Sequence, residues 1–183
     1  MFFTAVALSL IQAAAGQPAA PQNPQGWTVL DNDRGCAVNT AHNGGTRLSV
    51  FALPNREGIG FLMQNADWTT LDEGEVYPLT IRFDDGSDWR IPALARLQID
   101  RHGPGLFFAI RPGSAEDGRD FMQQFASAAG MDVTNNGAQV ERLRLTNSHA
   151  ATRALAQCIG RLWSGQPANP FRDSDSAHTA TRI

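Results

Sequence analysis

Two cysteines carry the most definite chemistry in this 183-residue chain. Cys36 lies near the start, and Cys158 lies in the run RALAQCIGRLW, on the apolar stripe of an expected helix. A catalytic thiol needs an exposed, electropositive setting, and a redox pair usually has C-x-x-C spacing; neither cysteine fits. In an oxidising compartment they predict one structural disulfide, Cys36–Cys158, which closes a loop of about 120 residues.

The histidines form no recognisable metal or nucleophile motif. His42, His102, His149 and His178 lack the H-E-x-x-H pattern and the paired Cys/His spacings of zinc sites. His149 and Cys158 are separated by two and a half helical turns, so their side chains project to opposite sides of the expected helix. We therefore expect no metal site, no cofactor and no local catalytic dyad.

Two acidic clusters lie in the turn sequences DNDRG and DDGSD. Asp31 and Asp33 resemble the start of a calcium loop, although the distal Glu that would bind the ion in bidentate fashion is missing. Asp84, Asp85 and Asp88 could hold a cation or act as the acid/base pair of a hydrolase. Hairpin turns favour these residue types for their own geometry, so the turn interpretation is preferred and cation binding at either cluster stays open.

Trp68, in the connection NADWTTLDEGE, is the candidate binding residue. A Trp between two strands can contact a partner or ligand, or it can anchor its loop on the sheet. The sequence has no Gly-rich phosphate loop, no G-x-S-x-G elbow and no kinase motif set. We expect a protein that is not an enzyme.

The elements that position these residues follow from hydrophobic periodicity. Alternation with a period of two predicts strands over 27–31, 36–40, 46–53, 59–64, 76–83, 88–99 and 106–110. Pro92 makes the sixth of these an edge or bulged strand. Helical spacing follows over 114–130 and from Thr146 or Asn147 to 163, with a hairpin within 132–145. This order predicts an α+β domain with an antiparallel β-meander sheet and two helices packed on one face.

The ends of the chain differ in composition from this domain. The run MFFTAVALSLIQAAAG is typical of a signal peptide, 1–16, and it is followed by a Pro/Gln-rich linker, 17–26. The single domain is expected over 27–163 and a disordered C-terminal tail over 164–183. No other run is long and apolar enough to cross a membrane. The net charge of −3 argues against a nucleic-acid partner, and all 15 basic residues are arginine.

The layout resembles a group of small proteobacterial envelope proteins, those around invasion-associated locus B. The positions that carry the resemblance are the run RLRLTNSHAATRALAQC and the residues Trp27, Val29, Cys36, Phe121, Phe125, Met131 and Val133. That group typically has a further cysteine pair, which this chain lacks. The resemblance implies a periplasmic or surface protein without an assigned active site, and it transfers no catalytic residue.

Together these observations predict an exported, periplasmic or secreted binding or accessory protein of the bacterial envelope, whose partner is another envelope protein. One alternative is a periplasmic hydrolase that uses the acidic turn residues. The other is an enzyme inhibitor or immunity-type protein that presents the loop 65–75.

Overall fold

Strands are the commonest secondary-structure elements of the described chain, because apolar and polar side chains alternate along much of it with a period of two. The computed structural model describes residues 26–32, 35–111, 115–164 and 181–182. Within these ranges ten strands form one sheet. Their bounds are β1 Trp27–Asn32, β2 Gly35–Ala41, β3 Arg47–Ala52, β4 Ile59–Gln64, β5 Val76–Phe83, β6 Asp88–Arg96, β7 Gly105–Ile110, β8 Gly130–Asn135, β9 Ala138–Arg144 and β10 Thr181–Arg182.

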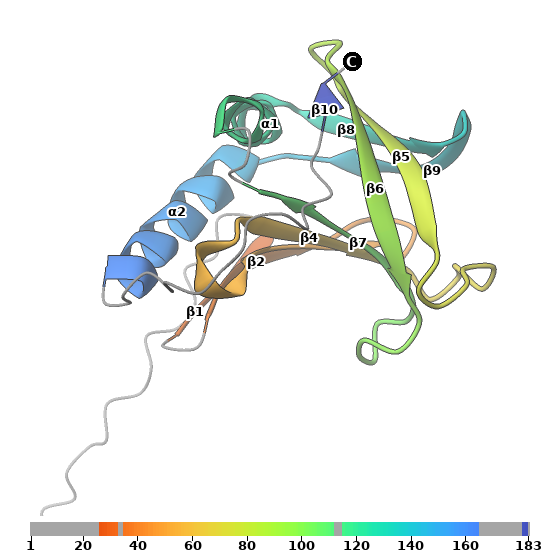
Figure 1. Cartoon of the computed structure of the whole chain (residues 1–183), viewed down its shortest axis with the longest axis horizontal. Helices are drawn as coiled ribbons and strands as arrows, with labels where there is room; N and C mark the ends of the chain where they lie inside the picture. Colours follow the sequence, from red (N-terminus) through yellow and green to blue (C-terminus); the bar gives the residue numbers. More distant parts are fainter. Residues whose placement is uncertain (1–25, 33–34, 112–114, 165–180, 183) are drawn as a thin grey trace, which may run out of the picture.

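The main sheet is antiparallel throughout and has the order β1-β2-β3-β4-β7-β6-β5-β8-β9. It departs from chain order where β4 pairs with β7. Figure 1 shows that the sheet curls: β1, β2, β4 and β7 lie in a lower wall, and β6 and β5 turn upward on the right. Two helices, α1 (Ala115–Ser127) and α2 (Ser148–Ser164), lie together on the left. The predicted α+β class with an antiparallel meander sheet is confirmed.

Two prolines explain why β6 pairs with β7 only near its C-terminal end. Pro78 of β5 lies opposite Pro92 of β6, and two residues without an N–H can face each other only at a non-hydrogen-bonded position. The missing N–H of Pro92 therefore points toward β7, and the β6–β7 ladder is confined to Leu94–Arg96. The remaining edge of β6 is open to another strand, and β10 pairs there with Trp89 and Arg90.

The structure describes two parts of the segment 164–183, for which a disordered tail is predicted. Ser164 is the last residue of α2, and Thr181–Arg182 form β10 on the open edge of β6. The rest of this segment lies outside the described residues, as do the predicted signal peptide, 1–16, and all of the predicted linker except Gly26. Among the described helices none is long and apolar enough to cross a membrane.

The core lies on the inner side of the curled sheet and is rich in aromatic rings. Phe121 of α1 is completely buried. Its ring makes edge-on contacts with the rings of four residues, at centroid distances of 5.3 to 6.4 Å: Phe61, Phe83, Trp89 and Phe108. Phe125, one turn later, packs edge-on against Trp27 of β1 at 6.0 Å. This spacing on α1 joins strands from both halves of the sheet into a single core.

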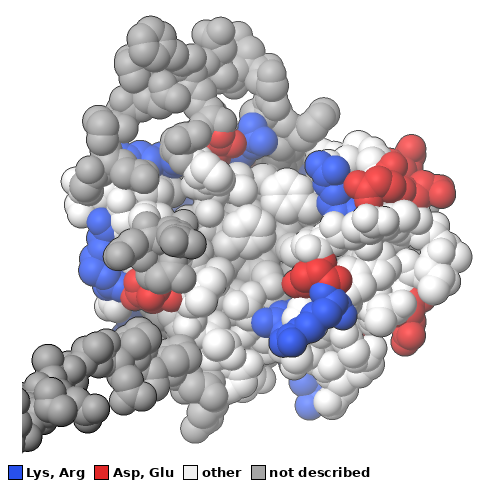
Figure 2. Space-filling model, turned by 90° about the horizontal axis from the view of Figure 1, so that it is seen from below, with Lys and Arg blue, Asp and Glu red and all other residues white. Residues whose placement is uncertain are grey.

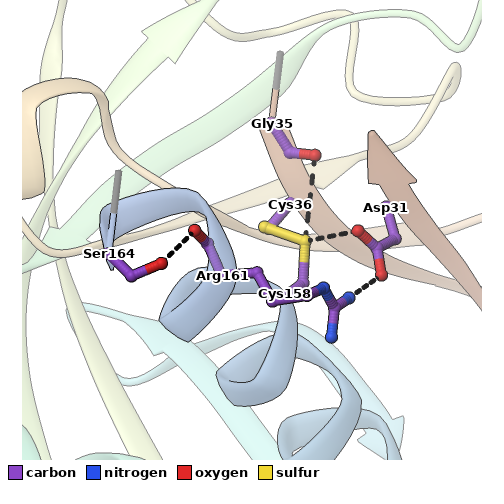
Figure 3. Close-up of a disulfide and its surroundings, with 6 residues drawn as sticks. All are labelled: Asp31, Gly35, Cys36, Cys158, Arg161 and Ser164. Atoms are coloured by element: carbon purple, nitrogen blue, oxygen red, sulfur yellow. Dashed lines mark hydrogen bonds and ion pairs between the residues drawn. A yellow bond between two sulfur atoms is a disulfide. The ribbon is translucent and has the colours of Figure 1, made fainter. Parts of the chain in front are cut away.

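A disulfide joins α2 to the lower wall. Cys36 of β2 and Cys158 of α2 are bonded, are each 2 % exposed, and have Cα atoms 5.7 Å apart. Figure 3 shows Asp31 of β1 beside the bond, with its Oδ1 3.2 Å from Cys158 Sγ. The same carboxylate forms an ion pair with Arg161, one turn further along α2. The predicted cysteine pair therefore lies where the last helix rests on the first hairpin.

Candidate functional site

A hollow of about 350 Å³ opens between β5, the β8–β9 hairpin and the loop after β4. Figure 1 shows β5 and the β8–β9 hairpin, two of the elements that line it, on the opposite side of the picture from α2. We call it the Trp68 hollow, and it is lined by Asp67, Trp68, Thr70, Leu71, Tyr77, Leu79, Leu106, Asn135, Gln139 and Val140. The structure therefore places the predicted binding residue in the wall of a concave surface, where ligands commonly bind.

Asn65 determines how the loop carries Trp68. Its Oδ1 accepts a hydrogen bond from the N–H of Asp67 at 2.9 Å, and its backbone carbonyl accepts one from the N–H of Trp68 at 3.2 Å. Its Nδ2 donates to the Gly44 carbonyl at 3.0 Å and to Thr46 Oγ1 at 2.8 Å. Because Asn65 is itself buried, these bonds tie the start of the loop to the β2–β3 turn. Trp68 is half-buried and packs against the edge of the core.

Tyr77 of β5 is the second aromatic residue that lines the hollow. It lies at the start of the inward-facing series of β5, ahead of Leu79, Ile81 and Phe83. Its hydroxyl accepts a hydrogen bond from the N–H of Asp72 at 3.2 Å, so it also holds the loop that carries Trp68. Two aromatic side chains thus face one small cavity from different elements.

Asn135 adds a polar group whose bonding capacity is unused. Its Oδ1 is buried and has no hydrogen-bond partner in the described structure. A buried acceptor left in this state costs about 1 to 3 kcal/mol, unless a ligand or water supplies a donor. Gln139 lies beside it, and its Nε2 donates to the carbonyls of Val133 and Glu141 at 3.3 and 2.5 Å. The hollow therefore combines aromatic surface with the side chain of Asn135, whose buried Oδ1 has no hydrogen-bond partner among the described residues.

Sequence reasoning identified Trp68 and missed Asn135. A signal was present: Met131 and Val133 alternate with it along β8, and both are buried. A polar residue in the inward phase of a strand marks either a buried polar network or a site.

A second polar cluster, made of His42, Thr46 and Glu141, connects the β2–β3 turn with β9. Thr46 is fully buried, and its hydroxyl donates to Glu141 Oε2. His42 lies in the same turn, with its Nε2 buried and without a partner in the described structure. Burial lowers the pKa of His42 below its ordinary value of 6.5, and the charge of Glu141 offsets part of this effect. Because Thr46 is inaccessible to solvent, its hydroxyl fits a structural role in linking the β2–β3 turn to β9 better than the role of a nucleophile.

The structure gives each acid of the second acidic cluster a separate local role. Asp84 accepts from the N–H of Ala129 at 3.0 Å, and Asp85 caps its own turn through the N–H of Ser87 at 2.9 Å. Asp88 pairs with Arg82, whose hydrogen bonds hold the pKa of that carboxyl below its usual range. The three carboxylates are thus engaged in different directions and do not converge.

The first acidic cluster is described only in part. Asp31 is engaged by Arg161, and Asp33 lies outside the described residues. Within the described ranges no group of three or more His, Cys, Asp or Glu side chains is arranged to hold a metal ion.

Compared with family models, curated proteins and solved structures, the chain matches none of them.

Proposed function

We propose that this protein is an exported, periplasmic or secreted binding protein of the bacterial envelope, and that it binds through the Trp68 hollow without catalysing a reaction. The observation that carries the proposal is the combination of Trp68, Tyr77 and Asn135 in the lining of one concave surface. Aromatic walls with a few polar groups are the usual make-up of a binding site.

The chemistry of the hollow specifies the kind of group that it takes. The group needs an apolar face to lie against Trp68 and Tyr77, and an N–H or O–H that can donate to Asn135. A cavity of about 350 Å³ is small, which suits a protruding loop tip better than a large cofactor. We propose that another envelope protein presents this group, as the resemblance to the locus B group also suggests.

The disulfide supports the proposed compartment. Disulfides persist in the periplasm and outside the cell, whereas cytosolic reductants keep most thiols reduced. Cys36 and Cys158 lie 122 residues apart and are bonded in the interior, which is the arrangement of a structural bond.

Site-specific photocrosslinking in intact cells tests the binding site. A benzophenone amino acid replaces Trp68 in the full-length protein, and in a matched control it replaces Trp163, which is also half-buried but lies at the end of α2. We expect one defined adduct from position 68 and none from position 163, and we expect Asn135→Leu to reduce the adduct at least roughly tenfold. Equal adducts at both positions, or none at position 68, would contradict the proposal.

Export is tested separately by mass spectrometry of the purified protein. We expect a mature chain that begins near Gln17 and is 2 Da lighter than its reduced form. A chain that retains Met1 in the cytoplasm, with two free thiols, would refute export. Activity that disappears when Asp84, Asp85 and Asp88 are all replaced by Asn, in a protein that still folds, would support the hydrolase instead.

A further inference from the structure

The outer side of the lower wall carries two rows of apolar side chains that neither α1 nor α2 covers. In the first row Leu62 of β4, Phe107 of β7 and Leu94 of β6 lie directly opposite one another. Each alternates with inward-facing residues of its strand and is half-buried. Val76 of β5 continues this row beyond the bend of the sheet and is 45 % exposed.

The second row runs parallel to the first across the wall. It consists of Leu30, Ala37, Phe51, Gly60 and Ala109, paired in that order across β1, β2, β3, β4 and β7. Leu30 is 52 % exposed. The rings of Phe51 and Phe107 join the two rows, with stacked planes and centroids 6.2 Å apart. We call these two rows, up to Phe107, the outer apolar face.

Two glycines keep this face level. A Cβ at Gly60 would lie 2.7 Å from Cε2 of Phe51, and a Cβ at Gly105 would lie 3.0 Å from Cδ1 of Leu62. Because these glycines have no side chains, the side chain of Phe51 lies across the backbone at Gly60 and that of Leu62 lies against Gly105. The result is a smooth apolar surface, whereas the outer side of the β5–β8–β9 part carries the exposed ion pairs of Arg82 and Arg142.

Basic side chains lie at two borders of the outer apolar face. Figure 2, which views the molecule from below, shows an area free of charged residues with both acidic and basic side chains around it. Arg47 and Arg96 belong to the next row of the register, and Arg111 follows the end of β7. Arg96 pairs with Glu73. Among the described residues Arg47 and Arg111 have no salt-bridge partner, although Arg47 Nη1 lies 3.1 Å from His102 Nε2 and the charge of Arg47 helps to lower the pKa of the nearby Asp100 carboxyl.

The dimensions of the face select among possible occupants. Five strands at about 4.8 Å spacing make it roughly 20 Å long. It is two apolar rows wide only on β4 and β7, because Ser49, Asn39 and Thr28 continue the first row across β3, β2 and β1. Its apolar footprint is therefore well below the roughly 800 Å² per partner of a stable dimer. Its length matches one helix of about 14 residues, which is roughly 21 Å long.

We propose that the outer apolar face docks an amphipathic helix of about four turns from a partner protein, with acidic residues flanking the apolar stripe of that helix. The stripe lies over Leu30, Phe51 and Phe107, and the flanking carboxylates meet Arg47 and Arg111. This surface is separate from the Trp68 hollow, so a negative result for one proposal does not affect the other.

Fluorescence anisotropy with two designed peptides tests the proposal on the full mature chain. Both are 14-residue helices, held by a side-chain staple, with the same Leu and Phe stripe; one is flanked by Glu and the other by Lys. We expect the Glu peptide to bind at least roughly tenfold more tightly, with an affinity that falls as salt is raised. Equal binding of the two peptides, or no binding of either, would overturn the proposal.

Matched variants locate the binding. Leu30→Ser and Phe51→Ser should each weaken the Glu peptide at least roughly fivefold, and Arg47→Glu should reverse the preference between the peptides. Leu97→Ser is the control, because Leu97 is 38 % exposed but follows β6 outside the face. Since Leu30 is exposed, its replacement tests the surface even if Phe51→Ser fails to fold.

Two further measurements distinguish helix docking from binding at the Trp68 hollow and from self-association. Trp68→Ala should leave binding of the Glu peptide unchanged, and a loss there would overturn the separation of the two surfaces. Sedimentation of the unliganded protein should show a monomer; a dimer abolished by Leu30→Ser would assign the face to a second copy and refute the helix.

Discussion

Replacing Cys36 and Cys158 together with alanine should lower the free energy of unfolding by about 3 to 5 kcal/mol. The bond closes a loop of 122 residues. The chain-entropy relation then gives roughly 16 cal/mol/K, or about 5 kcal/mol at 25 °C, by which the cross-link destabilises the unfolded chain. The lower limit allows for residual structure in the unfolded state. For a chain of this size the midpoint of thermal unfolding should fall by roughly 6 to 20 °C.

Urea unfolding, followed by tryptophan fluorescence, measures this loss. The oxidised protein, the reduced protein and the Cys36→Ala/Cys158→Ala variant are compared, and reductant should not change the variant. The dependence of unfolding free energy on urea should be steeper without the bond, because the unfolded chain then exposes more surface. A loss below about 1 kcal/mol would refute the reasoning and would mean that packing alone, through residues such as Leu155, holds α2.

Three other changes test the interior. Asn65→Ala removes two buried donor bonds, at 2.8 and 3.0 Å, and should cost about 1 to 3 kcal/mol in urea unfolding while shifting the emission of Trp68 to the red. Burial depresses the pKa of His42 in the folded protein, so as the pH falls the unfolded chain takes up this proton at a higher pH than the folded chain does. The free energy of unfolding should therefore decrease as the pH drops from 6.5 toward the depressed pKa, and His42→Gln should make this decrease smaller. Phe121→Ala should cost about 3 to 5 kcal/mol, against less than about 2 for the surface change Phe51→Ala, and equal losses would contradict the assignment of the core.

Local pattern was sufficient to predict most strands. The predicted bounds 59–64 and 76–83 agree with β4 and β5, because every second residue there, such as Phe61 and Met63 or Leu79 and Ile81, is apolar and partly or fully buried. The strand predicted over 88–99 ends earlier, at Arg96. The next residue, Leu97, gives its N–H to the Glu73 carboxylate instead of to a neighbouring strand. Apolar and polar residues keep alternating in the sequence beyond Arg96, and no nearby residue signals that the backbone stops pairing with a neighbouring strand there.

The candidate site was predictable only in part. Trp68 was identifiable because a large aromatic residue in a polar connection is conspicuous. Its neighbours Tyr77 and Asn135 come from strands that precede and follow α1, and no local spacing brings them to the same cavity.

The sequence by itself determined the strands, the two helices and the composition of each face, because these depend on side-chain periodicity within a few residues. It also indicated the disulfide, since two cysteines leave one intramolecular pairing. Only the tertiary structure decided which strands are neighbours. The pairing of β4 with β7, the separation of β6 at Pro92 and the curl of the sheet arise from contacts between distant segments. Those contacts create the Trp68 hollow on one side of the wall, and on the other side they leave the outer apolar face without a covering helix among the described residues.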